Sequence, residues 1–291
     1  MQTRPSPPDR HFPLVSIRIP SFNHRQFVEQ ALDSVIQDSY PNKELVIIDD
    51  GSTDDSAAVI SRWIDTNGHR IAVNYSRHPR NLGIARTLNE LVKRCAGEYI
   101  AGVASDDYLL PDGILQRYLY LQEHPEKLAV FGDCLVVDGA GQLMAESGLT
   151  GFHHANLGNF RSDASLRKEL ITNWSVPGPV LMVNRRVLEV VGPYNENLGI
   201  EDWDFYLRMA AQNLIGFLDR KVGAYRVHGK NYCMISEKET EHLKSLRKTL
   251  WINHSRFSWA DKWHIFKKIA GLSKGICASR LLKKRPERGL Q

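Results

Sequence analysis

The sequence predicts an α/β protein with a mostly parallel central sheet, flanking helices and a helical C-terminal tail. Three observations predict this fold. Short apolar runs rich in β-branched residues alternate with segments of helical periodicity through the first half of the chain, as in βαβ units. Between Trp259 and Leu281, apolar side chains recur at helical spacing among lysines and an arginine. The chain has 291 residues, 42% of them apolar, which is enough to bury a sizeable core.

The first half reads as alternating strands and helices. The first strand is expected at 14–20, where Val15, Ile17 and Ile19 alternate with polar residues. A helix at 24–38 follows, with an apolar stripe that includes Phe27 and Ala31. The same alternation predicts strands at 44–49, 71–76 and 97–104 and helices at 55–66 and 84–96.

The second half has a less regular pattern. It predicts strands near 128–133, 135–138, 180–184, 215–218 and 223–227, helices at 185–191 and 203–212, and a Gly-rich polar loop at 139–161. A basic amphipathic helix is expected between Trp259 and Leu281. We therefore divide the chain into a flexible N-terminus (1–13), a globular domain (14–235) with halves at about 14–110 and 111–235, and a helical tail (236–291).

Composition and charge exclude several classes of protein. No apolar run approaches the roughly 18 to 20 residues that span a bilayer, and residues 1–13 lack the apolar core of a signal peptide, so we expect a cytoplasmic protein. The four cysteines form no C-x-x-C pair, which argues against a metal knuckle or a redox dithiol. Residues 237–291 hold 14 Lys and Arg against 5 Asp and Glu, whereas the rest of the chain is net acidic. A nucleic-acid-binding protein would carry its basic surface on the folded domain, so no nucleic-acid partner is expected.

Polar clusters follow the predicted strands at the points where those strands end. They lie at 20–23, 49–54 and 104–107, and Glu201 with Asp202 begins a later helix. Each cluster alone is explained by a turn or a helix cap. Because the carboxyl ends of parallel strands meet at one edge of a sheet, the clusters are expected to converge there. Converging carboxylates need protonation or a cation, and Mg²⁺ or Mn²⁺ fits best, usually together with a phosphate-bearing substrate.

Six motifs in order carry a resemblance to a known family. They are IPSFNH (19–24), VIIDDGSTDDS (46–56), NLGIARTLN (81–89), SDDYLLPDGI (105–114), IEDWDFYLRMA (200–210) and YRVHGKN (225–231). From about 14 to 232 the chain resembles the family-two glycosyltransferases, which have the Rossmann-like nucleotide-diphospho-sugar transferase fold. The resemblance implies inverting transfer of a sugar from a nucleotide-diphosphate donor to an acceptor hydroxyl, in bacterial surface polysaccharide or glycolipid synthesis. It also implies that 14–110 form the nucleotide-binding half and 111–235 the acceptor half of the catalytic domain.

The resemblance also assigns residues to the donor. Base and ribose would lie against the end of the first strand, with Asp50, or alternatively Asp49, accepting a hydrogen bond from the base. Gly83 would allow close approach of the backbone to the nucleotide. The residues that the resemblance places at the nucleotide sugar are Pro20, Ser21, Asn23, Asp49, Asp50, Asn81, Gly83, Arg86 and Asp106.

The chemistry is assigned in the same way. Asp202 matches the general base that takes the proton of the acceptor hydroxyl. Asp106 and Asp107 match the metal and ribose carboxylates, and His228 matches a histidine that in some relatives helps to hold the metal or the diphosphate, so Mg²⁺ or Mn²⁺ is the expected cofactor. Many relatives carry D-x-D-D at this strand end. Here the first position is Ala104, so the metal site is expected to have one carboxylate fewer.

Other functions share single features with this sequence. The D-D-G-S-T run is similar to the D-x-D-G-T loop of haloacid dehalogenase phosphatases, but the position two before the second Asp is Ile48 and not an acid. A nucleotidyltransferase would need a Gly-rich, basic phosphate loop after the first strand, where residues 21–24 read Ser-Phe-Asn-His. A non-enzymatic alternative stays open, in which an inactive relative binds a nucleotide sugar or acts through its tail and Ala104 is the sign of decay.

The tail has two interpretations. One is a helix that packs its apolar stripe on the catalytic domain. The other is an anchor, in which Trp259, Trp263 and Phe266 lie in the headgroup layer of an anionic membrane. The concentration of positive charge after Glu237 favours the anchor, as does the resemblance, because many such transferases act on lipid-linked acceptors at the cytoplasmic face. We therefore expect a carbohydrate or lipid-linked acceptor and a peripheral position at the inner face of the plasma membrane.

Overall fold

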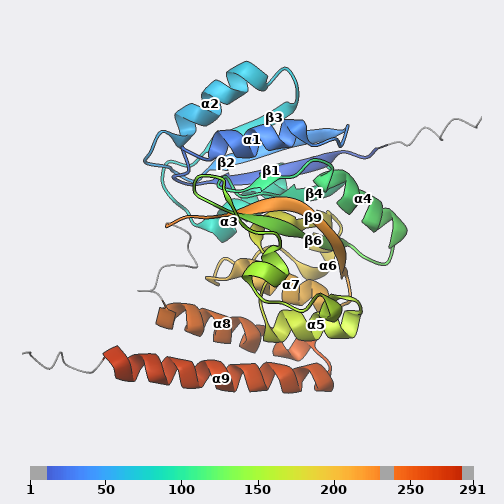
Figure 1. Ribbon diagram of the computed structural model, residues 1–291, viewed down its shortest axis with the longest axis vertical. Helices are drawn as coiled ribbons and strands as arrows, with labels where there is room; N and C mark the ends of the chain where they lie inside the picture. The colour runs from blue at the N-terminus through green and yellow to red at the C-terminus, as the bar shows by residue number, and fades with distance from the viewer. Residues whose placement is uncertain (1–11, 230–238, 284–291) are drawn as a thin grey trace, which may run out of the picture.

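A computed structural model of the chain describes residues 12–229 and 239–283, with side chains described at 12–229 and 240–277 (Figure 1). Most of the predicted flexible N-terminus and the predicted boundary between 235 and 236 lie outside the described residues. Within them, nine strands form one sheet in the order β3-β2-β1-β4-β8-β6-β9-β5, and β7 pairs with β6.

The first four strands form a parallel sheet covered on both faces. They are β1 (Val15–Ser21), β2 (Lys43–Asp49), β3 (Ala72–Arg77) and β4 (Tyr99–Gly102), joined through α1 (Val28–Gln37), α2 (Ser56–Asn67) and α3 (Ile84–Arg94). In β2, Leu45 and Ile47 pack in one apolar cluster with α1 and α2, whereas Val46 and Ile48 pack in another with α3. Burial of both faces explains why β2 is an apolar run and not an alternating one.

The second half of the sheet is mixed. Strand β8 (Leu181–Asn184) runs antiparallel to β4 and to β6 (Ala129–Asp138), and β9 (Ile215–Val227) runs parallel to β6. Two short strands, β5 (Tyr108–Leu109) and β7 (Leu143–Ala145), pair antiparallel with β9 and β6. The predicted fold class, a helix-flanked α/β sheet with helices at the C-terminus, is confirmed, with antiparallel pairing confined to these later strands.

Strands β6 and β9 are each one long strand, where the sequence predicted two pairs of short ones. The register between them shifts around Phe131, Asp133 and Cys134, which is an irregularity of the kind that a β-bulge makes. Residues 219–221 of β9 are polar and exposed, which is why the apolar pattern breaks there although the strand continues.

Several helices of the second half were not predicted. Helix α4 (Gly113–Glu123) and helix α5 (Asp163–Thr172) flank β6 in the sequence, and the predicted loop at 139–161 contains β7 and two helical turns, η1 (Gly148–Phe152) and η2 (Leu157–Phe160). A third turn, η3 (Gly178–Val180), leads into β8. Helices α6 (Val187–Val191) and α7 (Glu201–Ala210) agree with the prediction within two residues at each end.

The tail forms two helices, α8 (Glu239–Asn253) and α9 (Trp259–Lys283), with a turn, η6 (His254–Arg256), between them. Both lie beneath α5 and α7, at the opposite end of the molecule from α2 (Figure 1). Buried Ile265 and Leu272 join α9 to the apolar core. No helix in the described part of the chain is long and apolar enough to cross a membrane.

Candidate active site

The carboxyl ends of β1 and β2 are joined by Asn23. Ser21 and Asp49 are paired in register at the last positions of the two strands, so the loops that follow leave from one edge. Asn23 has φ +57, a left-handed conformation that Asn tolerates better than most residues. Its Oδ1 accepts hydrogen bonds from the backbone N–H of Thr53 at 2.8 Å and of Asp54 at 3.3 Å. The turn at Asn23 thus binds the loop after β1 to the loop after β2.

Asp49 and Asp50 are both buried but have different surroundings. Asp49 is fully buried, its Oδ1 accepts the backbone N–H of Ser52, and its Oδ2 has no hydrogen-bond partner. Asp50 Oδ1 accepts the N–H of Leu82 at 2.8 Å, and its Oδ2 accepts that of Gly83 at 3.0 Å. Asp50 therefore fixes the loop that holds Asn81 and Gly83.

This loop leaves open space above Gly83. Gly83 has φ +92, and a Cβ added there would meet no atom within 4 Å. Gly51, in contrast, has φ +72 and its added Cβ would lie 2.3 Å from the backbone of Arg80, so any side chain at 51 would collide with the backbone of Arg80 and Asn81. Arg86 and Asn81 are exposed beside Gly83, so the backbone at 83 can be approached closely by a ligand.

Asp106 and Asp107 lie in the turn between β4 and β5 and have opposite pKa shifts. Burial alone would raise the pKa of Asp106, but the hydrogen bond from His228 and the charge of His24 outweigh it and lower the pKa below its ordinary value. Burial and the negative charge of Asp106 raise the pKa of Asp107 well above its ordinary value. Two adjacent carboxyl groups are thus divided into an ionised one and one that holds a proton more readily.

Arg226 joins the end of β9 to this turn. Its backbone N–H donates to Asp107 Oδ1 at 2.8 Å, and its guanidinium donates to the carbonyl oxygens of Asp106 at 2.8 Å and Asp138 at 3.1 Å. The guanidinium also lies 4.8 Å from the centre of the Phe27 ring. Because Arg226 is held on several sides, His228, two residues further on, is directed toward Asp106.

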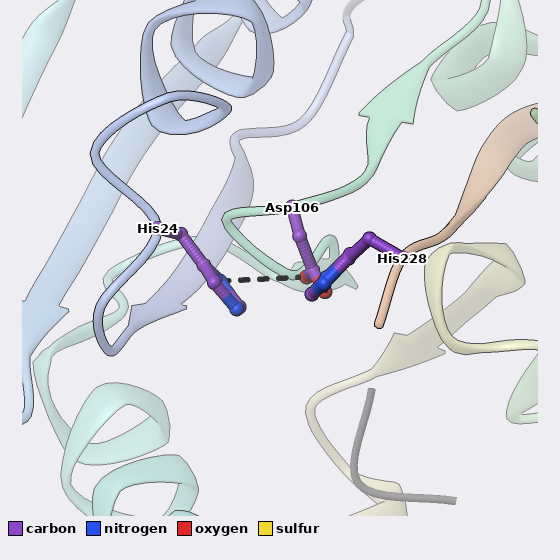
Figure 2. Close-up of side chains that lie close together, drawn as sticks. All are labelled: His24, Asp106 and His228. Carbon is purple, nitrogen blue, oxygen red and sulfur yellow. Dashed lines mark hydrogen bonds and ion pairs between the residues drawn. The ribbon is translucent and has the colours of Figure 1, made fainter. Parts of the chain in front are cut away.

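Three side chains from three different loops meet at this edge (Figure 2). His228 Nε2 lies 3.0 Å from Asp106 Oδ2, and His24 Nδ1 lies 3.6 Å from Asp106 Oδ1. One ligand atom from each of the three lies within 4.8 Å of those from the other two. Ligands about 2.1 Å from one cation stand about 3 Å apart when adjacent and about 4.2 Å apart when opposite, so the set fits a single divalent ion. Carboxylate oxygen suits Mg²⁺ and Mn²⁺, and imidazole nitrogen suits first-row transition-metal ions such as Fe²⁺ and Zn²⁺.

Asp202 lies at the N-terminus of α7. It is partly exposed, and its Oδ1 accepts the backbone N–H of Trp203 at 2.7 Å. Burial raises its pKa above the ordinary value for an aspartate. Its neighbour Glu201 is 8% exposed, and burial together with the charge of Asp202 raises the pKa of Glu201 to about 8. A carboxylate with a raised pKa is a better proton acceptor near neutral pH.

Two of the sequence-predicted metal residues meet in the structure, and the third is hydrogen-bonded elsewhere. Asp106 and His228 are in contact, while the Oδ1 atom of Asp107 accepts the N–H of Arg226. Sequence reasoning gave no role to His24, although it stands inside the IPSFNH motif, nor to His78, which bridges Asp50 Oδ1 at 2.7 Å and Glu90 at 3.0 Å. The position of His24 next to Asn23, at a strand end, is the signal that could have included it.

These features define a nucleotide-diphospho-sugar transferase fold, and comparison with known proteins agrees. The chain belongs to glycosyl transferase family 2, whose family model matches residues 16–191. The match ends before Asp202 and His228.

Relatives and solved structures extend the likeness over most of the chain. Chondroitin synthase of Escherichia coli is 24% identical over 254 residues, which are 83% of this chain but 33% of that protein. The chain thus spans about a third of the length of this relative. The crystal structure of S. aureus TarS 1-349 with UDP-GlcNAc superimposes with a TM-score of 0.67 at 17% identity, over 94% of this chain and 76% of that one. The structure of the mannosyltransferase PcManGT of Pyrobaculum calidifontis with GDP-Man and Mn²⁺ superimposes with a TM-score of 0.64 at 17% identity, over 94% of this chain and 77% of that one.

Proposed function

We propose that the protein is an inverting glycosyltransferase that moves a sugar from a nucleotide-diphosphate donor to an acceptor hydroxyl. The observation that carries the proposal is the meeting of Asp106 and His228 at the carboxyl edge of the sheet, in a chain of glycosyl transferase family 2. A transferase of this kind must hold a diphosphate, and such a group of side chains can do so through a divalent cation.

The nucleotide is proposed to lie over the loops after β1, β2 and β3. Open space above Gly83 and the exposure of Asn81 and Arg86 support this placement. Asp50 is the better candidate for contact with the base, because it retains 4% exposure whereas Asp49 has none. Pro20, Ser21 and Asn23, at the end of β1, are proposed to line the same nucleotide site.

Asp106 and His228 are the proposed metal ligands, and Asp107 is a candidate through Oδ2, the oxygen that does not accept the Arg226 N–H. When bound, Mg²⁺ or Mn²⁺ offsets the negative charge that develops on the departing nucleoside diphosphate. The hydrogen bonds of Arg226 hold the Asp106–Asp107 turn in place before the donor arrives, so little reorganisation is needed on binding.

Asp202 is the proposed general base. Its carboxylate takes the proton of the acceptor hydroxyl as the oxygen bonds to the sugar, while the nucleoside diphosphate leaves from the opposite face with the electron pair of the broken bond. A single displacement of this kind inverts the anomeric centre. The raised pKa of Asp202, caused by burial, makes its carboxylate a stronger base than an exposed aspartate.

The acceptor is proposed to be a carbohydrate or lipid-linked chain in bacterial surface polysaccharide or glycolipid synthesis. The similarity to a chondroitin synthase supports a polysaccharide product. The residues of the second half, 111–235, are proposed to face this acceptor.

The tail is proposed to bind the inner face of the plasma membrane. One side of α9 is packed, but Trp259, Trp263 and Phe266 are 84%, 70% and 42% exposed. Trp251 of α8, 58% exposed, stacks on His254, whose ring lies 5.7 Å from that of Phe266, so these rings form one surface. We call Trp251, Trp259, Trp263 and Phe266 the aromatic patch. Lys262 lies 4.7 Å from the Trp259 ring, so positive charge accompanies the patch, as in interfacial helices.

A donor screen tests the proposed reaction. The purified chain is incubated with a panel of UDP-, GDP- and dTDP-sugars and Mn²⁺ or Mg²⁺, and thermal shift and donor hydrolysis are followed. We expect one class of donor to raise the melting temperature and to be slowly hydrolysed. Stabilisation without any hydrolysis or transfer would favour the inactive, nucleotide-sugar-binding alternative, and no effect of any donor would contradict the proposal.

A further inference from the structure

We propose that His24 is a third protein ligand of the divalent cation, and that its presence makes the site select Mn²⁺ over Mg²⁺. This inference rests on the metal use proposed above. The sequence left the choice between the two ions open and gave His24 no role, whereas the structure places its ring against the same carboxylate that His228 contacts (Figure 2).

The two imidazoles lie on different oxygens of Asp106. His228 Nε2 is 3.0 Å from Oδ2, and His24 Nδ1 is 3.6 Å from Oδ1. The two rings are 5.6 Å apart between centres and nearly perpendicular, at 83°. His228 is the inner ligand, 8% exposed at its side chain, while His24 is 22% exposed and stands at the rim. A cation within reach of all three would therefore keep an open side toward solvent, where diphosphate oxygens can enter.

His24 is held in place by its backbone. Its N–H donates to Ser56 Oγ at 2.9 Å, and its carbonyl accepts the N–H groups of Phe27 at 2.9 Å and Val28 at 3.0 Å. The left-handed turn at Asn23 directs the chain into this position. A histidine fixed at main-chain level loses little freedom on binding a metal, which favours affinity.

The Nδ1 atom of His24 also lies 2.8 Å from the hydroxyl of buried Ser105. This contact allows a purely structural role, in which His24 serves only as the hydrogen-bond partner of the Ser105 hydroxyl. Asparagine can distinguish the two roles, because its amide can keep a hydrogen bond near the position of Nδ1 but offers oxygen instead of imidazole nitrogen.

The donor set decides which of the two ions is preferred. Mg²⁺ favours oxygen ligands and keeps its waters. Mn²⁺ also accepts oxygen, but as a first-row transition-metal ion it gains more from imidazole nitrogen than Mg²⁺ does, although less than the later ions of that row. A site with one carboxylate and two imidazoles is therefore a poor magnesium site. With asparagine at 24 the set would hold two oxygens and one nitrogen, and the advantage of Mn²⁺ would fall.

The experiment measures metal binding without any donor. Free Mn²⁺ is counted by electron paramagnetic resonance during titration of the full chain, Mg²⁺ is added as competitor, and electron spin-echo modulation reports nitrogen bound to Mn²⁺. The variants are His24→Asn, His228→Asn and, as matched control, His69→Asn at an exposed histidine outside the site. Thermal unfolding without metal checks each fold.

We expect wild type to bind one Mn²⁺ with two coordinated imidazoles and to prefer Mn²⁺ over Mg²⁺ by at least tenfold. His24→Asn should weaken Mn²⁺ binding by about tenfold or more and lose one nitrogen signal, because it replaces an imidazole nitrogen by a weaker amide oxygen, and even loss of a group that only orients a ligand costs about tenfold. Mg²⁺ affinity should change much less, because Mg²⁺ favours oxygen ligands. Unchanged Mn²⁺ affinity and nitrogen signal in His24→Asn, or no Mn²⁺ binding by wild type, would overturn the inference. The donor screen is a separate experiment, so the two proposals can fail independently. If the wild type turns over a nucleotide sugar but His24→Asn binds Mn²⁺ as wild type does, only the inference about His24 is overturned. If the chain binds Mn²⁺ as expected but no nucleotide sugar, only the proposed function is overturned.

Discussion

Glu201 and Asp202 are consecutive carboxyl groups at the start of α7, and burial together with the charge of Asp202 raises the pKa of Glu201 to about 8. A carboxyl whose pKa is higher in the folded than in the unfolded state stabilises the fold while it is protonated, relative to its ionised form. This contribution is complete below the unfolded value near 4.5 and is lost as the pH rises through 8.

We therefore predict that Glu201→Gln makes the protein less sensitive to alkaline pH. The free energy of unfolding of wild type should fall relative to that of the variant between pH 4.5 and 8, by on the order of a few kcal/mol, and the difference should level off above pH 9. Urea unfolding across this range measures it, with Glu123→Gln at an exposed site on α4 as control. Parallel pH profiles for wild type and Glu201→Gln would show that Glu201 ionises normally.

Replacing the proposed base should separate binding from chemistry. Asp202→Asn keeps the size of the side chain, and its amide oxygen can still accept the Trp203 N–H, but it cannot take a proton. We predict that transfer falls by about 10²- to 10⁴-fold while the donor-induced thermal shift stays within error of wild type.

The pH profile of wild type gives a second readout. Because burial raises the pKa of Asp202 and the base works ionised, the rate should rise with pH through a pKa higher than that of an ordinary aspartate. If the activity of Asp202→Asn stayed within a few-fold of wild type, Asp202 would not be the general base and its role would be limited to the N-terminus of α7.

The part of the site that sequence could predict is the part set by strand ends. Asp49, Asp106 and Ser21 follow apolar runs whose periodicity is local, so their arrival at one edge follows from parallel topology alone. The strand end marks His24 as a candidate, but its role could not be assigned, because the partner that gives it one, Asp106, lies far away in sequence.

The same limit applies to the fold. Strands β6 and β9 pair along their whole length, and the pairing carries them through polar residues such as Asp133 and Lys221 that interrupt the apolar pattern. Their extent is decided by the partner strand and not by local propensity. Asp50 is an example at the level of a single residue. Its carboxylate accepts the backbone N–H groups of Leu82 and Gly83, and no spacing in the sequence reveals this long-range contact.

The two aspartates of the β4–β5 turn should respond differently to loss of charge. Asp106→Asn removes the carboxylate that lies between two histidines, so Mn²⁺ binding and metal-dependent transfer should both fall by at least tenfold. Asp107 holds a proton more readily, because burial and then Asp106 raise its pKa, and its Oδ1 accepts the Arg226 N–H. Asp107→Asn can keep that hydrogen bond, so we predict a smaller loss of Mn²⁺ affinity.

Manganese titration of both variants decides between these roles, with transfer measured in parallel and in excess chelator. Equal losses would make Asp107 a metal ligand of the same rank as Asp106. Ala104→Asp adds a carboxylate beside them and should tighten Mn²⁺ binding. Full transfer in chelator would contradict the metal proposal altogether.

The aromatic patch should carry membrane binding without taking part in the fold. Trp259 and Trp263 are largely exposed, whereas Ile265, Leu272 and Ile276 on the same helix are buried. Trp259→Ser with Trp263→Ser should therefore change the melting temperature little, since surface substitutions away from packed groups usually cost under about 0.5 kcal/mol. Binding to anionic vesicles should fall by at least tenfold, because each indole buries a large apolar surface in the headgroup layer.

Sedimentation with phosphatidylglycerol-containing and with purely phosphatidylcholine vesicles measures this binding at low and at physiological salt. Wild type should sediment with the anionic vesicles and less so as salt rises, because the attraction of lysines to the surface is screened. Leu143→Ser with Met144→Ser is the matched control, since these two apolar residues of β7 are also about half exposed but lie outside the tail. If the control and the tryptophan variant lose binding equally, the membrane contact is not made by α9. If wild type binds neither vesicle, the exposed rings belong to a protein interface instead.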